Sequence, residues 1–261
     1  MKHSLCLPRY APQVDPETRA ILASAGYEPS PEEFDFFERL RARITEANAS
    51  LNLTRLTEPR DFWIKHVLDS LLPFYAVRGL SGIDDKALVA DFGSGPGFPG
   101  FALAHRFPHW DVALIERTQK KCDFLEETVE KLGLTNVFVV PLDAREAVHQ
   151  VEALDRGCDL VVARAVGRLA KVTRQAEPLL RPHGLLLHYK GGTLADDEIA
   201  EGRAAAREVG AKQHDPEYYE LPPDMKRAAV IVESLSQSRK RREVSKRKKA
   251  RKKLPPPGDQ P

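Results

Sequence analysis

The stretch ADFGSGPGFPGFALA, residues 90–104, decides the fold of this chain. It begins at the end of a short apolar run, ALVADF (87–92), and leads into the helical pattern FPGFALAHRF (98–107). An apolar strand, a glycine-rich turn and a helix in this order are typical of the first unit of an open α/β sheet, where the turn lies against a ligand. We therefore expect residues 90–104 to form both the start of the sheet and the centre of a binding site.

Apolar runs and helical patterns alternate along the rest of the chain. The further strands are expected at DVALIE, NVFVVPL, CDLVVARA and LLLHYK, and the helices at residues 118–133, 168–184 and 194–210. This alternation predicts parallel βαβ units, and the near-continuous apolar strands predict helices on both faces. EYYELP and RAAVIVESL have no helix between them, which predicts an antiparallel hairpin at one edge. The fold class is therefore α/β, with a mostly parallel, Rossmann-like sheet.

The residues before the sheet are expected to form a helical N-terminal extension. In SPEEFDFFERLRARITEAN (30–48), Ser30 can be the N-cap, Pro31 suits the first turn and Glu33 completes a capping box. EPRDFWIKHVLDSLLPFYA (58–76) predicts a second helix. We expect an irregular lead-in with one short helix at 1–29, the extension at 30–80, the α/β domain at 81–235 and a basic tail at 236–261.

Charge is distributed unevenly along the chain. RKRREVSKRKKARKK (239–253) holds eleven of the 40 Lys and Arg residues, so residues 1–238 carry 29 basic and 36 acidic side chains, a net charge of −7. A block of like charges repels itself, stays solvated and attracts polyanions. The tail is either a solubilising segment or a nucleic-acid tether, and the scarcity of neutralising charge favours the tether.

Composition argues against several classes of protein. No apolar run approaches the roughly 20 residues of a membrane helix. The three cysteines, Cys6, Cys122 and Cys158, are far apart and show no metal-ligand spacing. We therefore expect a cytoplasmic protein with no disulfide framework, no metal and no membrane contact.

The glycine loop fits two ligands. Gly95, Gly97 and Gly100 match G-x-G-x-x-G, the spacing of a dinucleotide-binding loop, whereas Gly93, Gly95 and Gly97 behind Asp91 match a loop that holds S-adenosylmethionine. Both ligands require a carboxylate at the end of the second strand for their ribose hydroxyls.

Three residues separate the two ligands. Pro96 and Pro99 lack the N–H groups that a pyrophosphate would need at the helix N-terminus. Asp91 would repel a pyrophosphate but would suit the cationic S-adenosylmethionine. Glu116, 21 residues after Gly95, supplies the ribose carboxylate in either case. The loop therefore favours the methyl donor.

Six segments resemble one family. NLTRL, HVLDSL, ADFGSGPGFPGFALA, ERTQKKCDFL, VVARAVGRL and YKGG occur in this order, and together they resemble the RsmG (GidB) family of bacterial small-subunit rRNA guanine-N7 methyltransferases, from about residue 30 to residue 233. The resemblance implies a class I methyltransferase fold. It also implies S-adenosylmethionine as cofactor and methylation of N7 of one guanine in 16S rRNA near the decoding site.

The resemblance also implies a set of cofactor contacts. Together with the loop motif, the predicted cofactor-binding residues are Asp91, Gly93, Ser94, Gly95, Gly97, Phe98, Glu116, Ala144, Arg145 and Arg164. Three features depart from the family pattern. The charges of DARE (143–146) are in a different order, RAVGRL (164–169) replaces RAFASL, and the basic tail is an addition.

The chemistry explains why no general base is evident. N7 of guanine has an exposed lone pair and needs no deprotonation, so the enzyme can work largely by positioning. His66, Asp69 and Ser70 occupy one helical turn, which rarely gives the geometry of a hydrolytic triad. We expect this helix to shape the substrate mouth, and the candidate RNA contacts are His66, Lys120, Arg164 and Lys190.

The expected partner is 16S rRNA, either free, in the small ribosomal subunit or in an assembly intermediate, and the enzyme is expected to act as a monomer. Two alternatives remain at this stage. One is a dinucleotide-dependent oxidoreductase, which rests on the literal G-x-G-x-x-G. The other is a non-catalytic RNA-binding factor, which the tail and the altered 143–146 segment leave open.

Deleting residues 239–261 should reduce RNA affinity and flatten its dependence on salt concentration, because eleven cations are removed. Cofactor affinity should not change. Filter binding with 16S rRNA over a salt series measures the first effect and calorimetry the second. An unchanged salt slope would mean that the tail only solubilises the protein.

Overall fold

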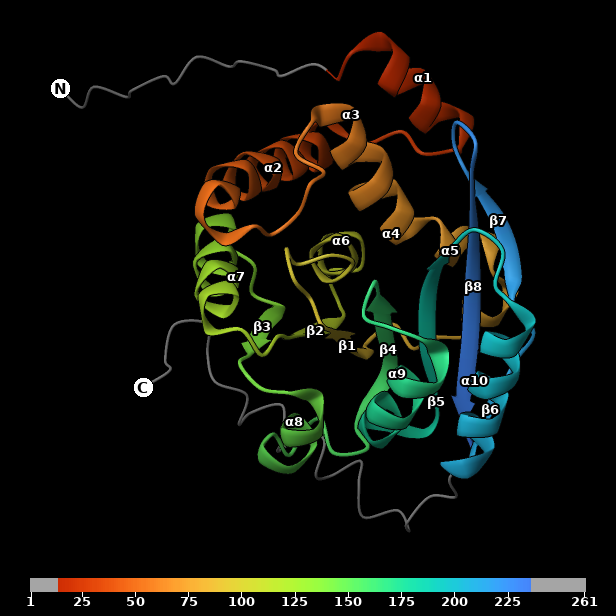
Figure 1. Cartoon of the computed structure of the whole chain (residues 1–261). Coiled ribbons are helices and arrows are strands. Elements are labelled where there is room, and N and C mark those ends of the chain that lie inside the picture. Colours follow the sequence, from red (N-terminus) through yellow and green to blue (C-terminus); the bar gives the residue numbers. More distant parts are fainter. Residues whose placement is uncertain (1–13, 236–261) are drawn as a thin grey trace, which may run out of the picture.

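The computed structural model describes residues 14–235, in which one mixed sheet is covered by helices on both faces (Figure 1). The expected basic tail lies outside the described residues. The strand order is β3-β2-β1-β4-β5-β8-β6, and β7 also pairs with β8. The strands are β1 (Leu88–Phe92), β2 (Asp111–Ile115), β3 (Val137–Val140), β4 (Cys158–Arg164), β5 (Leu180–Gly191), β6 (Ala211–Gln213), β7 (Glu217–Leu221) and β8 (Met225–Ser234).

The sheet has the predicted directions. Strands β1 to β5 pair in parallel, while β8 is antiparallel to β5, β6 and β7. The expected hairpin of β7 and β8 at one edge is therefore confirmed, and the short β6 beside it was not predicted. β1 pairs with both β2 and β4, so the chain reverses its direction of winding at β1. A reversal of this kind opens a crevice at the carboxyl ends of the strands.

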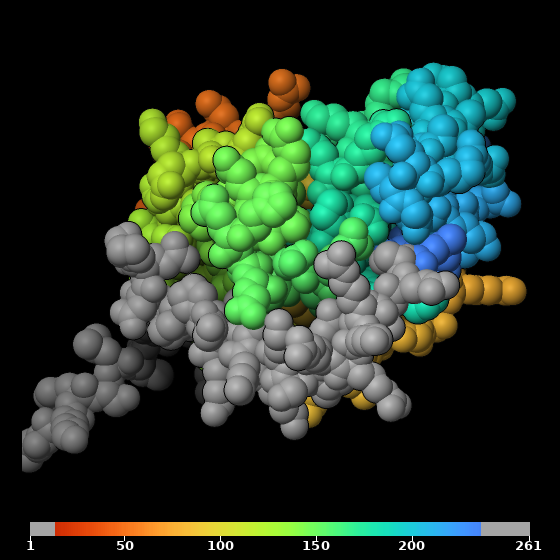
Figure 2. Space-filling model, turned by 90° about the horizontal axis from the view of Figure 1, so that it is seen from below, coloured from red at the N-terminus to blue at the C-terminus, as the bar shows by residue number. Residues whose placement is uncertain are grey.

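The helices form two layers (Figure 1). α2, α6 and α7 lie on one face with the segment from α3 to α5, and α8, α9 and α10 lie on the other; α8 and α10 contribute much of the surface seen in Figure 2. The helices are α1 (Pro16–Ser24), α2 (Pro31–Leu51), α3 (Pro59–Asp61), α4 (Asp69–Leu71), α5 (Pro73–Ala76), α6 (Gly100–Arg106), α7 (Gln119–Leu132), α8 (Ala144–Gln150), α9 (Leu169–Ala176) and α10 (Asp196–Glu208). None of these helices is long and apolar enough to cross a membrane.

Alternate side chains of the strands enter two different cores. Val89 of β1 and Leu160 of β4 pack with Phe37, Leu40 and other residues of the extension, whereas their neighbours along each strand pack toward α8 and α9. The period of two along a strand explains this division, and it accounts for the continuous apolar runs in the sequence. The helical extension therefore shares one core with the sheet, and a boundary at residue 80 stays a prediction.

The predicted N-terminus of α2 is confirmed in one part and wrong in another. Ser30 accepts a hydrogen bond from the backbone N–H of Glu33 at 3.2 Å, and Pro31 occupies the first turn. The carboxylate of Glu33 does not complete a capping box but accepts a hydrogen bond from the hydroxyl of Tyr27 at 2.9 Å. Tertiary packing of Tyr27 against α2 has replaced the local bond.

The predicted helix over residues 58–76 is interrupted. α3 continues into a π-helical segment, η1 (Phe62–Leu68), which is followed by α4 and α5. The wider turn of a π-helix is often found at functional sites. Here it includes His66, whose side chain is turned toward the ends of the strands.

One helix end and one whole helix differ from the prediction. The helix expected over 168–184 ends at Ala176, because Pro178 lacks the N–H that a continuing helix requires. A 3₁₀ turn, η3 (Glu177–Leu179), leads directly into β5. The helix α8 was not predicted. Its N-terminus is formed by the altered DARE segment, residues 143–146. Asp143 is the N-cap, and the carboxylate of Glu146 accepts a hydrogen bond from the backbone N–H of Asp143, which completes a capping box.

Candidate active site

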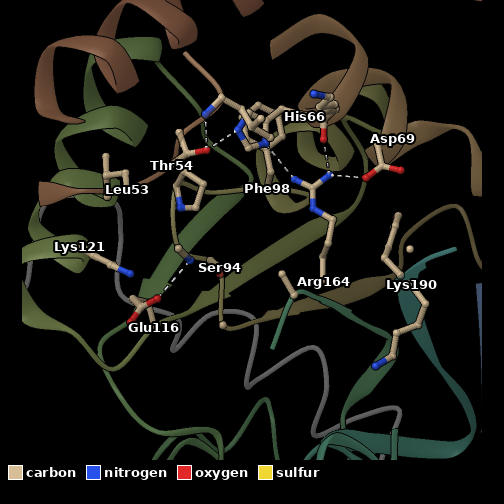
Figure 3. A pocket seen from close by; sticks show the side chains of 18 of the residues that line it. Leu53, Thr54, His66, Asp69, Ser94, Phe98, Glu116, Lys121, Arg164 and Lys190 are labelled. Atoms are coloured by element: carbon tan, nitrogen blue, oxygen red, sulfur yellow. Dashed lines mark hydrogen bonds and ion pairs between the residues drawn. The ribbon is translucent and has the colours of Figure 1, made fainter. Parts of the chain in front are cut away.

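A cavity of about 600 Å³ lies at the carboxyl ends of the strands, beside the point where the winding reverses (Figure 3). Its walls come from the glycine loop after β1, the ends of β2, β4 and β5, and the extension from Leu53 to Asp69. Pockets for small ligands typically enclose 300–1,000 Å³. The predicted residues that line it are His66, Gly93, Ser94, Gly95, Phe98, Glu116, Arg164 and Lys190.

Other predicted residues lie outside this lining. They are Asp91, Gly97, Lys120, Ala144 and Arg145, and the roles predicted for them stay predictions. Conversely, Asp69 and Arg227 line the cavity and were not predicted as site residues, and Lys121 lines it where its neighbour Lys120 does not. The sequence does hold a signal for Arg227. This residue lies near the start of the predicted antiparallel strand, and such a strand starts at the edge of the sheet where the parallel strands end.

The glycine loop is held in a conformation that requires glycine. Gly93, Gly95 and Gly97 have φ angles of +76°, +54° and +94°. A Cβ atom on Gly97 would lie 2.2 Å from the ring of Phe101, whereas one on Gly95 would meet no atom closer than 4.0 Å. Gly97 therefore permits close packing beneath the loop, and Gly95 faces open space at the cavity.

Glu116 fastens the loop from the end of β2. Its carboxylate accepts hydrogen bonds from the backbone N–H groups of Gly95 at 3.1 Å and Thr118 at 2.9 Å. The side chain is buried but lines the cavity. A carboxylate has about four lone-pair positions, so Glu116 can also accept hydrogen bonds from hydroxyl groups of a ligand.

Asp91 supports the loop from behind. Oδ2 accepts a hydrogen bond from the backbone N–H of Gly100 at 2.9 Å, and Oδ1 is buried without a hydrogen-bond partner among the described residues. Burial raises the pKa of this carboxyl to about 7, against the hydrogen bond from Gly100 and the charge of Arg164, which lower it. A Cβ atom on Gly100 would lie 2.8 Å from Oδ2, which explains the glycine there. Asp91 holds α6 and is not among the residues that line the cavity, so its predicted contact with the cofactor stays a prediction.

Arg164 joins the sheet to the extension. Its Nη1 donates to the backbone oxygen of Lys65 at 3.2 Å and to Asp69 Oδ2 and Ser70 Oγ at 3.3 Å. Its Nη2 lies 3.2 Å from His66 Nδ1, and its guanidinium lies over the ring of Phe98. The position at the end of β4 agrees with the prediction, but most donors of Arg164 are already occupied within the chain.

The tautomer of His66 follows from its partners. Because arginine only donates, Nδ1 must accept from Arg164, and Nε2 then carries the hydrogen and donates to Thr54 Oγ1 at 3.1 Å. The ring also stacks on Phe98, with centroids 4.8 Å apart. Burial, and secondly the charge of Arg164, lower the pKa of His66 to about 3. His66 is therefore neutral near pH 7.

No hydrolytic triad forms on this helix. The hydroxyl of Ser70 donates to the backbone oxygen of His66 and not to its ring. Asp69 accepts from Arg164 and, at 2.8 Å, from Arg227 Nε. The expectation that this helix shapes the mouth of the site is consistent with the lining of the cavity.

The cavity has two ends of different character. Leu53, Glu116 and Lys121 lie at one end, and Asp69, Arg164 and Lys190 at the other (Figure 3). Lys190 donates to the backbone oxygen of Gly167 and to Glu198, both at 2.7 Å. Within residues 14–235 no cluster of His, Cys, Asp or Glu side chains could hold a metal ion. The arrangement can hold an extended ligand with hydroxyls at one end and an anionic group at the other.

Comparison with known proteins places the chain among RNA-modifying enzymes. The profile of the family described as rRNA small subunit methyltransferase G (GidB) matches residues 34–218. The protein of that name from Deinococcus deserti is 37% identical over 227 residues, which cover 85% of this chain and 90% of the relative. The protein of the same name from Gloeobacter violaceus is 33% identical over 208 residues, covering 79% and 80%. These matches confirm the resemblance seen in the sequence.

A solved structure supports the fold. The crystal structure of MtNAS in complex with MTA and tNA overlays with a TM-score of 0.50 at 13% identity, and the overlay covers 74% of this chain and 70% of that one. At this identity the likeness shows the fold alone.

Replacing His66 by Gln should flatten the dependence of stability on pH. The pKa of His66 lies below its ordinary value of 6.5, so the unfolded chain takes up the proton first. The stability due to the neutral ring is complete above pH 6.5 and is lost as the pH falls toward 3. Over that window His66→Gln should lower the slope of the unfolding free energy by up to about 1.4 kcal/mol per pH unit.

Urea denaturation at several pH values measures this slope. The control is His109→Gln, because His109 is exposed and lies outside the cavity lining. His109→Gln should leave the slope close to that of the wild type. Equal slopes for the wild type and His66→Gln would contradict a buried neutral His66.

Proposed function

The chain belongs to the rRNA small subunit methyltransferase G family, and we propose that its cavity binds S-adenosylmethionine beside N7 of a guanine in 16S rRNA. The single observation that carries the site assignment is the junction of the glycine loop with Glu116 at the end of β2. It unites a backbone that approaches a ligand closely with a carboxylate for hydroxyl groups. Family membership removes both the oxidoreductase and the non-catalytic RNA-binding factor as alternatives.

The residues present fit this cofactor. Glu116 can accept hydrogen bonds from the two ribose hydroxyls, and the open space at Gly95 lets the ligand approach the loop backbone. Arg227 at the other end supplies a cation for the carboxylate of the methionine part or for RNA. Pro96 offers no N–H to a pyrophosphate.

When bound, S-adenosylmethionine supplies a methyl group on a cationic sulfur. Transfer of that methyl group to guanine N7 would form a carbon–nitrogen bond as the carbon–sulfur bond breaks, and the positive charge would pass to the purine. No proton moves, so the chain has to position the base, hold it in line and exclude water. A neutral His66 stacked on Phe98 suits this task, because it forms an uncharged wall that can neither protonate N7 nor repel the product.

The substrate follows from the same assignment. We place the reaction in the cytoplasm, on 16S rRNA or the small subunit, with the protein acting as a monomer. Arg164 and Lys190 donate most of their hydrogen bonds within the chain. We therefore infer that these two residues shape the wall of the cavity and that other side chains hold the RNA.

Incubating the full-length chain with unmodified 16S rRNA, or with small subunits, and labelled S-adenosylmethionine should give one 7-methylguanine. Mass spectrometry of nuclease fragments, with and without the protein, locates it. Methylation of a different atom, or no transfer to either substrate, would contradict the proposed function.

Replacing Gly93 by Val should weaken S-adenosylmethionine binding by roughly 10- to 100-fold, the equivalent of 1–3 kcal/mol of backbone strain. Its φ angle is +76°, and a Cβ atom would meet Val166 at 3.1 Å. Isothermal calorimetry gives the affinity. The matched control is Gly133→Val at the end of α7, where φ is +67° and no atom lies within 4 Å. That control should lose stability but keep the wild-type affinity for S-adenosylmethionine. An equal loss of affinity in both variants would contradict a direct role of the loop in cofactor binding.

A further inference from the structure

Four of the five lysines and arginines that line the cavity form ion pairs with carboxylates, but Lys121 and three cations that flank it do not. Lys65 pairs with Asp61 at 2.7 Å and Lys190 with Glu198 at 2.7 Å. Away from the cavity, Arg174 of α9 pairs with Glu208 at 2.7 Å and Arg203 of α10 pairs with Asp215. Arg55, Arg117, Lys120 and Lys121, which line or flank one end of the cavity, form no ion pair within residues 14–235.

These four residues, which we name the cationic rim, come from two separate segments of the chain. Arg55 lies between Thr54 and Leu56, both of which line the cavity, and Arg117 follows Glu116, which also lines it. Lys120 and Lys121 open α7, and Lys121 itself lines the cavity. Figure 3 shows Lys121 beside Leu53 and Glu116, at the end opposite Arg164 and Lys190.

The local field makes this arrangement costly for the protein alone. The N-terminus of a helix carries a partial positive charge, so cations in the first turn are disfavoured. α2, α8 and α10 accordingly begin with acidic residues, whereas α7 has none in its first turn and has two lysines instead. A bound anion would relieve this repulsion.

The surroundings of the rim leave it able to bind an external anion. The carboxylate of Glu116 is engaged by the backbone of Gly95 and Thr118. Arg117 helps to lower the pKa of Asp143, but the carboxylate of Asp143 caps α8 and accepts from Arg145. Arg55, Arg117 and Lys120 are exposed to solvent.

We propose that the cationic rim binds the phosphate backbone of the RNA on the side of the cavity formed by α7 and the 52–58 loop. This inference rests on the proposed function and names the surface by which the substrate is held. Residues 1–238 have a net charge of −7, so a polyanion needs a local cluster of free cations to approach them. Contacts to phosphate position a nucleic acid without reading its sequence, which suits a rim outside the reacting centre.

The test compares two triple variants of the full-length chain. Arg55→Gln/Arg117→Gln/Lys120→Gln removes the exposed rim charges and leaves Lys121 in the cavity. Arg19→Gln/Arg207→Gln/Lys212→Gln removes three exposed cations from α1, α10 and β6, none of which lines the cavity. Both variants lose three positive charges, so a difference in their RNA affinity depends on where the charges lie and not on how many are lost.

Binding to unmodified 16S rRNA is measured over a salt series. Each lost phosphate contact lowers the slope of log K against log salt by about 0.7–0.9, so the rim variant should lose about 2–3 from its slope, and roughly 10- to 100-fold in affinity near 0.15 M salt. The slope of the control variant should fall by less than about 1. Replacing Arg55 and Arg117 by Lys should retain the wild-type slope.

Two further readouts separate this inference from the proposed function. S-adenosylmethionine affinity should be unchanged in the rim variant, and methyl transfer should show a raised KM for RNA with little change in kcat. Equal salt slopes in the rim and control variants would overturn the inference about the rim. The proposed function would not be affected if the wild type still transferred the methyl group. Absence of methyl transfer by the wild type would contradict the proposed function, and the salt slopes would still decide whether the rim binds RNA.

Discussion

The guanidinium of Arg164 joins the helical extension to the sheet, and the cavity depends on that junction. Its donors reach the backbone of Lys65, the carboxylate of Asp69 and the ring of His66, all on the segment that begins with the π-helix. A buried arginine is stable only when its donors are satisfied. The two parts of the chain are therefore held at one distance and in one orientation, and the cavity between them keeps its shape.

The same junction sets the electrostatics of the site. Arg164 forces Nδ1 of His66 to accept, and burial keeps the ring uncharged. One carboxylate, that of Asp69, pairs with both Arg164 and Arg227, so this end of the cavity keeps a net positive charge. The adjoining wall at His66 is uncharged near pH 7, which suits a reaction that moves positive charge from a ligand to a base without moving a proton.

The glycine loop depends on the buried carboxyl group of Asp91. Asp91 holds the first N–H of α6, and the glycine at position 100 exists because any side chain would strike that carboxylate and Leu114. In the GFPG half of the motif, Gly97 and Gly100 thus belong to the support of the loop, whereas Phe98 lines the cavity. The GSG half, with Glu116, belongs to the face that meets the ligand.

The parallel strands, the edge hairpin and the position of the ligand loop could be predicted from the sequence, because buried parallel strands and their glycine turn leave local patterns. The family resemblance could also be read there, since its motifs are contiguous. The uneven distribution of charge, with its acidic body and basic tail, is likewise a property of the sequence alone. Only the tertiary structure decided that Asp91 lies behind the loop, that Lys121 and not Lys120 lines the cavity, and that Arg227 reaches it from an antiparallel strand. The direction of a side chain and the meeting of distant segments depend on packing across the whole fold, which no local pattern records.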